Sequence, residues 1–457
     1  MRISTRAPLW RDRIADWWSD AWRWLLIAAG AVLAVYLLLD RGAGDRVAAA
    51  VTLAGLVVGL VVTFSKPLAI ALMAMPALFV TARVSFGAGG LSVSDVALAA
   101  AFGTAVLLGH RPYSRPLRQL LWLNLIYQFA TLFTVIVNPQ VENTVEWFHA
   151  WMLISGALIV GWALGRGGHA SIALKLMVGT ATLIAVGTVV AGVMQYAVGN
   201  FGAVYPAWPI ALHKNAAGTL MTFAALILYV NPPWAKLPTR VVRIVLPLMI
   251  VAILVTQSRQ ALIGLVLGVI VVVARRRSTG HSALTLLFAI PAIWLVIATV
   301  IEQIESQNQH NSYFVRIEWM QEVYAFWKHA PIFGHGLRFW YYNPAVPYQP
   351  PQAEIEVAAS AGLVGLAGFL IMWAGVFIVI WRLDPMYGAL AMAVTLSRFA
   401  AAQFDLFWVA AQVSIPFVIA GICIGAMARA SADPPGPSSA SVLVRQPVPL
   451  PLAGRGG

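Results

Sequence analysis

Positively charged side chains lie directly beside long apolar runs, where a charge is costly and is therefore a candidate for function. Arg259 lies in a short connection between two such runs, and His213 and Lys214 directly precede a third run. A guanidinium offers a planar fork of donors, and a helix N-terminus carries partial positive charge, so both arrangements favour a phosphate or diphosphate ligand. The simpler alternatives are an arginine that extends to the membrane interface and an ordinary interfacial lysine beside an N-capping Asn215.

A polar and aromatic segment at 302–355 carries two further arginines. We predict a helix at 313–328 that lies along the membrane surface, because apolar and aromatic residues recur there at helical spacing. Arg316 would lie at the start of this helix, and Arg338 follows a turn that contains His335. We expect Arg316 to have a function, whereas the aromatic side chains are expected only to anchor the segment.

Acidic side chains accompany these cations. Three residues share one helix face at positions i, i+4 and i+7, namely Glu142, Glu146 and His149. A metal site is one interpretation, but metal-binding carboxylates usually have tighter spacing. A solvated helix end is therefore preferred, and no metal is expected. Elsewhere, Asp405 follows Arg398 by seven residues, so the two side chains could pair on one helix face.

Apolar runs of spanning length make up most of the chain, which has 457 residues, 60% of them hydrophobic and 10% charged. Such runs indicate transmembrane helices, and we predict an all-α, polytopic bundle of about fourteen spans, or twelve to thirteen if short runs do not cross. The transmembrane domain would cover 21–430, after an amphipathic lead-in at 1–20 and before a disordered tail at 431–457. The runs are 21–39, 47–64, 67–82, 91–109, 120–137, 144–165, 173–198, 215–230, 241–257, 260–275, 283–301, 356–381, 386–400 and 408–428.

The distribution of Lys and Arg predicts the orientation of these spans. With the N-terminus in the cytoplasm, 21 of the 30 basic residues fall on inner connections, and the segment at 302–355 lies outside. Both termini would then be cytoplasmic. The net charge of +13 is explained by topology, so no nucleic-acid partner is expected.

Several chemistries have no support in the sequence. The chain contains no Walker, GxSxG or HExxH motif and no GxGxxG in a suitable context, so soluble nucleotide chemistry is unsupported and no cofactor is expected. The single cysteine, Cys423, excludes a disulfide framework. A transporter or flippase for a lipid-linked glycan is an alternative, but it would need charges along a path through the membrane, and mid-span charges are few.

The order of five motifs resembles the O-antigen ligase and O-antigen polymerase superfamily of bacterial membrane proteins. They are HKNAAGTL at 213–220, TQSRQAL at 256–262, RIEWMQEVYAFWKHAPIFGHG at 316–336, EVAASAGLVGLAG at 356–368 and QFDLFWVAAQVSIP at 403–416. The resemblance implies a GT-C-like, metal-independent and inverting glycosyltransferase. Its donor would be a glycan on undecaprenyl diphosphate at the outer leaflet, and its acceptor a lipid or another glycan.

The resemblance also implies roles for individual residues. Arg259 and Arg316 would hold the donor diphosphate, with Lys214 nearby. We add His213 and Arg338 to this set as candidates, because both lie beside these cations on the outer side. Membrane lipids and other glycan-assembly membrane proteins are the further partners expected.

One departure affects the catalytic base. In the ligases a His-Asn pair opens the segment that ends in the Gly-Leu-Val-Gly element, whereas Pro351 and Gln352 occupy those positions here. The resemblance therefore does not identify the catalytic base, and Glu354, Glu356 and His335 are the candidates. The missing histidine makes a strict lipid A ligase less favoured than a polymerase or another surface-glycan transferase.

Overall fold

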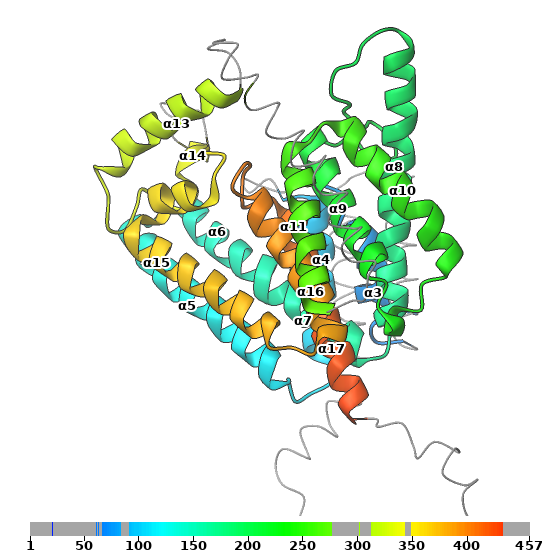
Figure 1. Ribbon diagram of the computed structural model, residues 1–457. Coiled ribbons are helices and arrows are strands. Elements are labelled where there is room, and N and C mark those ends of the chain that lie inside the picture. Colours follow the sequence, from blue (N-terminus) through cyan, green and yellow to red (C-terminus); the bar gives the residue numbers. More distant parts are fainter. Residues whose placement is uncertain are drawn as a thin grey trace, which may run out of the picture.

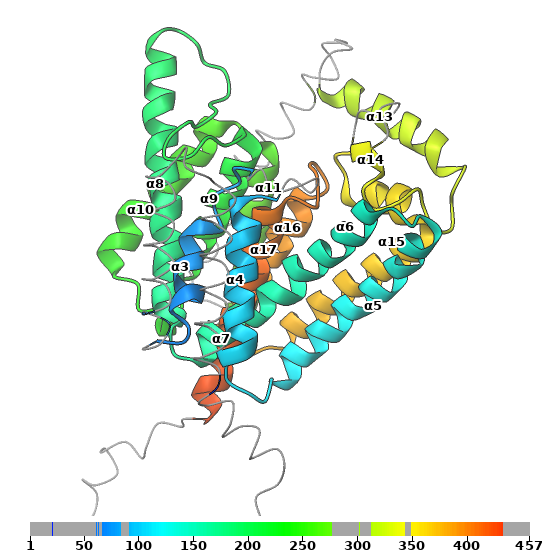
Figure 2. The same cartoon turned by 180° about the vertical axis from the view of Figure 1, so that it is seen from behind.

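The protein is a bundle of helices, shown in Figures 1 and 2. The computed structural model describes residues 66–83, 91–276, 312–342 and 349–432, and the single positions 21, 61, 63 and 301. The helices of these residues are α3 (Ala69–Ala77), α4 (Val93–Leu108), α5 (Arg115–Val137), α6 (Val141–Trp151), α7 (Ala157–Arg166), α8 (Ala170–Ala197), α9 (Lys214–Val230), α10 (Thr239–Thr256), α11 (Arg259–Arg276), α13 (Ser312–Trp327), α14 (Phe339–Tyr342), α15 (Ala353–Trp381), α16 (Pro385–Ala401) and α17 (Ala410–Ala432). A π-helical turn at Met152–Gly156 joins α6 to α7.

Six spans confirm the predicted all-α, polytopic bundle. The described helices long and apolar enough to cross a membrane are Arg115–Val137, Val141–Arg166, Ala170–Ala197, Thr239–Thr256, Ala353–Trp381 and Ala410–Ala432. The protein is therefore a multi-pass membrane protein. The helix predicted at 313–328 is also present, as α13.

The prediction for the run at 67–82 is wrong. Only the nine residues of α3 are helical there, which is too short to span a bilayer. The chain turns after Ala77 and continues to a single antiparallel bridge between Arg83 and Ser92. The predicted runs at 21–39, 47–64 and 283–301 fall almost entirely outside the described residues, as do the lead-in and the tail from 433.

Glycines at four-residue spacing line the contact between α7 and α17. Gly161 and Gly165 face Gly421 and Gly425, and a Cβ atom at any of them would overlap backbone atoms of the other helix. Small residues of this kind let membrane helices approach closely. The resulting pair contacts α4, α8 and α16, so it lies at the centre of the bundle.

Helix α15 is broken at Gly362, and a turn at 331–336 fits into the break. Gly362 has φ 67° and ψ −170°, so it interrupts the helical hydrogen-bond ladder. The N–H groups of 335 and 336 donate to the carbonyls of 359 and 360, and those of 363 and 364 donate to 331 and 332. Irregular backbone inside a membrane protein needs such internal partners. The turn is thereby fixed against α15.

Candidate functional site

Two helix N-termini lie side by side where Lys214 and Arg259 begin α9 and α11. The Ser258 hydroxyl is 3.4 Å from the Asn215 side-chain oxygen, and a Cβ atom at Gly218 would lie 2.9 Å from the Cβ atom of Ser258. The two positive helix ends and two cationic residues therefore share one region. This arrangement favours an anion. Binding of a diphosphate by Lys214 and Arg259 stays a prediction.

His213 caps the start of α9. Its Nδ1 accepts a hydrogen bond from the Asn215 backbone N–H at 3.3 Å, and its ring packs edge-on against Tyr205 with ring centroids 5.3 Å apart. The imidazole is exposed. Its contacts are those of a helix cap beside Lys214.

The connection between α16 and α17, residues 402–409, joins this region to α15. Gln260 donates from Nε2 to the Asp405 carboxylate at 2.7 Å. The backbone N–H of Phe407 donates to Glu356 at 3.1 Å, and the N–H of Ala353 donates to the Ala402 carbonyl at 3.0 Å. The starts of α11 and α15 are therefore linked through one connection, at the end of the bundle where α14 lies in Figure 1.

The predicted pairing of Arg398 with Asp405 is wrong. Helix α16 ends at Ala401, so the two residues do not share a helix face. The fully buried Arg398 guanidinium donates instead to the Gln412 side chain at 2.8 Å and to the carbonyls of Leu406 and Phe407. A buried guanidinium requires such acceptors. Arg398 therefore fixes the shape of the 402–409 connection.

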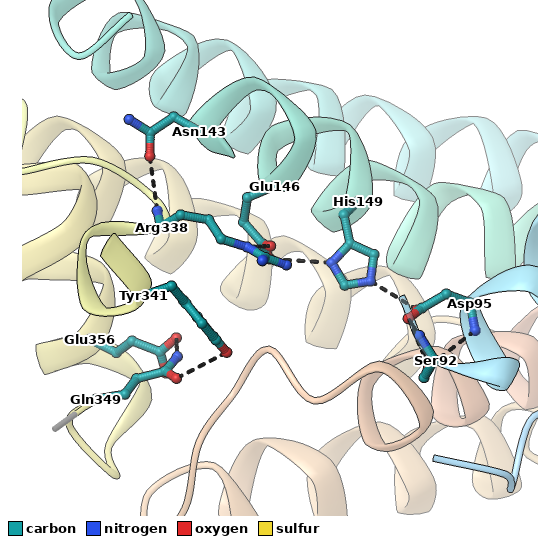
Figure 3. A network of polar contacts seen from close by, with 9 residues as sticks. All are labelled: Ser92, Asp95, Asn143, Glu146, His149, Arg338, Tyr341, Gln349 and Glu356. Atoms are coloured by element: carbon teal, nitrogen blue, oxygen red, sulfur yellow. Dashed lines mark hydrogen bonds and ion pairs between the residues drawn. The ribbon is translucent and has the colours of Figure 1, made fainter. Parts of the chain in front are cut away.

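Glu356 is the more deeply buried of the two carboxylates at the start of α15, with 2% of the residue exposed. It accepts a hydrogen bond from Gln349 Nε2 at 2.7 Å in addition to the one from Phe407. Tyr341 approaches the same Gln349, as Figure 3 shows. A carboxylate offers about four acceptor positions, so two donors leave capacity for a substrate hydroxyl. Glu354, by contrast, accepts from the side chains of Gln352 and Gln403.

Arg338 directly precedes α14 and contacts residues of α6. Its Nε donates to Glu146 Oε2 at 2.8 Å, and its backbone N–H donates to the Asn143 side chain at 2.9 Å. The guanidinium carbon lies 4.7 Å from the centroid of the Tyr341 ring. In Figure 3, Arg338 and Tyr341 lie next to each other, at the end of the network opposite Asp95.

The prediction that Glu146 and His149 form a solvated helix end is wrong. Both side chains are only 10% exposed, and His149 lies between Glu146 and Asp95. Glu142 alone is exposed, as predicted. The sequence reasoning missed Asp95, which lies 54 residues before His149. The pattern Ser92-x-x-Asp95 before an apolar run could have indicated Asp95 as a residue at a helix start, because Ser92 and Asp95 form a capping box at the start of α4.

His335 lies in the turn that enters the break of α15. Its Nε2 is 2.7 Å from the Phe326 carbonyl oxygen, and its ring packs against Phe339 with centroids 4.8 Å apart. These contacts attach α13 to the turn. Arg316 belongs to α13, but its side chain lies outside the described part of the structure.

The fold and this end of the bundle define a polytopic α-helical membrane protein with cations and buried carboxylates gathered beside helix ends. Residues 244–370 match the family model described as O-Antigen ligase. This match supports an O-antigen ligase-like membrane enzyme and confirms the resemblance indicated by the sequence motifs. The matched segment includes Arg259, Arg338 and Glu356 but not Lys214. No match is found among curated proteins.

Proposed function

We propose that the protein is an inverting, metal-independent glycosyltransferase that uses a glycan on polyprenyl diphosphate, with undecaprenyl diphosphate as the expected carrier. The observation that carries the proposal is that the adjoining helix N-termini at Lys214 and Arg259 are linked to the buried Glu356 through the 402–409 connection, by the bonds from Gln260 to Asp405 and from the Phe407 N–H to Glu356. The family match supports lipid-linked glycans as the class of substrate. The site would face the outside of the bacterial plasma membrane, in a GT-C-like arrangement.

The cations would act on the leaving group. Arg259, Lys214 and the neighbouring helix ends would neutralise the diphosphate, with His213 beside them and Arg316 and Arg338 completing the set. Charge that develops on the diphosphate as the glycosidic C–O bond breaks is stabilised by donors already in place. We assign to these preorganised donors the largest part of the protein's contribution to catalysis.

Glu356 would act as the general base. The acceptor hydroxyl forms a new C–O bond to the anomeric carbon from the face opposite the diphosphate, and its proton passes to the Glu356 carboxylate. The polyprenyl diphosphate leaves with the electron pair of the broken bond. Glu354 and His335 are the other candidates for the base. Glu354 also accepts two hydrogen bonds but is less buried than Glu356, and His335 Nε2 contacts the Phe326 carbonyl.

The identity of the acceptor distinguishes a polymerase from a ligase. A polymerase would transfer the glycan to another lipid-linked repeat unit, and a ligase would transfer it to a separate lipid. We favour the polymerase or a related surface-glycan transferase, because Pro351 and Gln352 stand where ligases have His-Asn.

Deletion of the gene followed by sizing of the surface glycans tests this proposal. We expect single repeat units to persist while long chains disappear, as for a polymerase. Long unattached chains would indicate a ligase. Surface glycans of unchanged length and attachment would overturn the proposed function.

A further inference from the structure

A buried series of charged side chains connects α4 to Arg338, as Figure 3 shows. The Asp95 carboxylate lies 2.9 Å from His149 Nε2, and His149 Nδ1 lies 3.3 Å from Glu146 Oε1. The other oxygen of Glu146 accepts from Arg338 Nε at 2.8 Å. Each of these side chains is at most 16% exposed. The series joins three segments that are far apart in the sequence.

The contacts define the charge of His149. Asp95 also accepts from the backbone N–H and the hydroxyl of Ser92, at 2.8 and 2.7 Å, and Glu146 accepts from Arg338. A hydrogen bond from His149 to each ionised carboxylate needs a donor on each ring nitrogen, which an imidazolium provides. With this imidazolium the series contains two anions and two cations and has no net charge.

Loss of this imidazolium would change Arg338 in two ways. The two carboxylates would remain with a single cation, so the group would carry a net negative charge close to where a diphosphate would bind. Glu146 would also lose the partner that fixes its second oxygen, although the Asn143 contact to the Arg338 backbone would persist. A bidentate or charge-assisted contact depends on a fixed guanidinium plane.

We propose that Asp95, His149 and Glu146 are positioning residues that orient Arg338 and balance its charge for binding of the donor diphosphate. This inference rests on the proposed function, and it adds the N-terminal half of the chain to the site. Because His149 acts through Arg338, the two residues must be coupled. A purely structural role for His149 would produce no such coupling.

Binding of undecaprenyl diphosphate to the purified full chain in detergent, measured by isothermal titration, tests the inference. We expect H149Q to weaken binding about tenfold, as for loss of a charge-assisted hydrogen bond. D95N should weaken it in the same direction. In the R338A background, H149Q should weaken binding by less than it does in the wild-type background, since coupled residues are not additive. The matched control is E142Q, which changes an exposed glutamate one turn before Glu146 on α6 and should bind like the wild type.

The outcomes separate this inference from the proposed function. Weaker binding by R338A with unchanged binding by both H149Q and D95N would overturn the inference alone. Equal losses from H149Q in the wild-type and R338A backgrounds would also overturn it, because the effect would not pass through Arg338. Absence of binding by the wild type would instead count against the proposed function. If H149Q does not fold, D95N and its combination with R338A provide the same comparison.

Discussion

Replacing Glu356 with glutamine is expected to lower the rate of glycosyl transfer by about 10²- to 10⁴-fold, the usual contribution of a general base. The amide keeps the shape of the side chain and can still accept from the Phe407 N–H, but it cannot take the acceptor proton. Binding of undecaprenyl diphosphate should stay within about twofold of wild type, because the carboxylate acts on the acceptor. Single-turnover transfer with purified protein measures the rate.

The comparison variant is E354Q, which changes a carboxylate two residues earlier that interacts with Gln352 and Gln403. We expect its transfer rate to fall by less than about fivefold, because the change removes no catalytic proton acceptor. Transfer by E356Q at the wild-type rate would exclude Glu356 as the base. A large loss with E354Q alone would transfer that role to Glu354.

Replacing Gly362 with alanine is expected to lower the free energy of unfolding by about 2–5 kcal/mol, from a left-handed backbone and steric overlap together. A Cβ atom there would overlap the Ile332 carbonyl, and the φ of 67° disfavours any side chain. Because the turn at 331–336 is fixed against α15 and directly precedes Arg338, transfer activity should fall with stability. Thermal unfolding in detergent and the transfer assay measure the two effects.

Gly199 supplies the matched control, because it has φ 81° and open space around an added Cβ atom. G199A should therefore cost only the backbone term, about 1–2 kcal/mol. An unfolding midpoint for G362A as high as that of G199A would show that the turn tolerates an added methyl group. The break of α15 would then not depend on glycine.

The helices were largely predictable from the sequence. Long apolar runs such as 173–198 and 241–257 match α8 and α10 within a few residues, because length and hydropathy suffice to define a spanning helix. The prediction of a spanning helix at 67–82 was wrong because hydropathy alone does not show where the chain turns. The break at Gly362 was equally hidden, since its hydrogen-bond partners lie some thirty residues earlier.

The site was predictable in part. Arg259 and Lys214 precede apolar runs, so each could be placed at a helix end from the sequence. That the two lie near each other was implied only by the family resemblance. The partners of Arg338 could not, because Asp95 and Glu146 meet it only through tertiary packing. Helical spacing suggested that Arg398 could pair with Asp405, but α16 ends at Ala401, so the two residues do not share a helix.

Affinity for undecaprenyl diphosphate, compared between the wild type and R259A, tests most directly whether the cations at this end of the bundle hold a polyprenyl diphosphate. Loss of a charged hydrogen-bonding partner should weaken binding by about 10- to 100-fold. R382A removes an exposed arginine from the C-terminal end of α15, far from the start of that helix, and should bind like the wild type. Equal affinity of R259A and the wild type, with both proteins folded, would contradict the account.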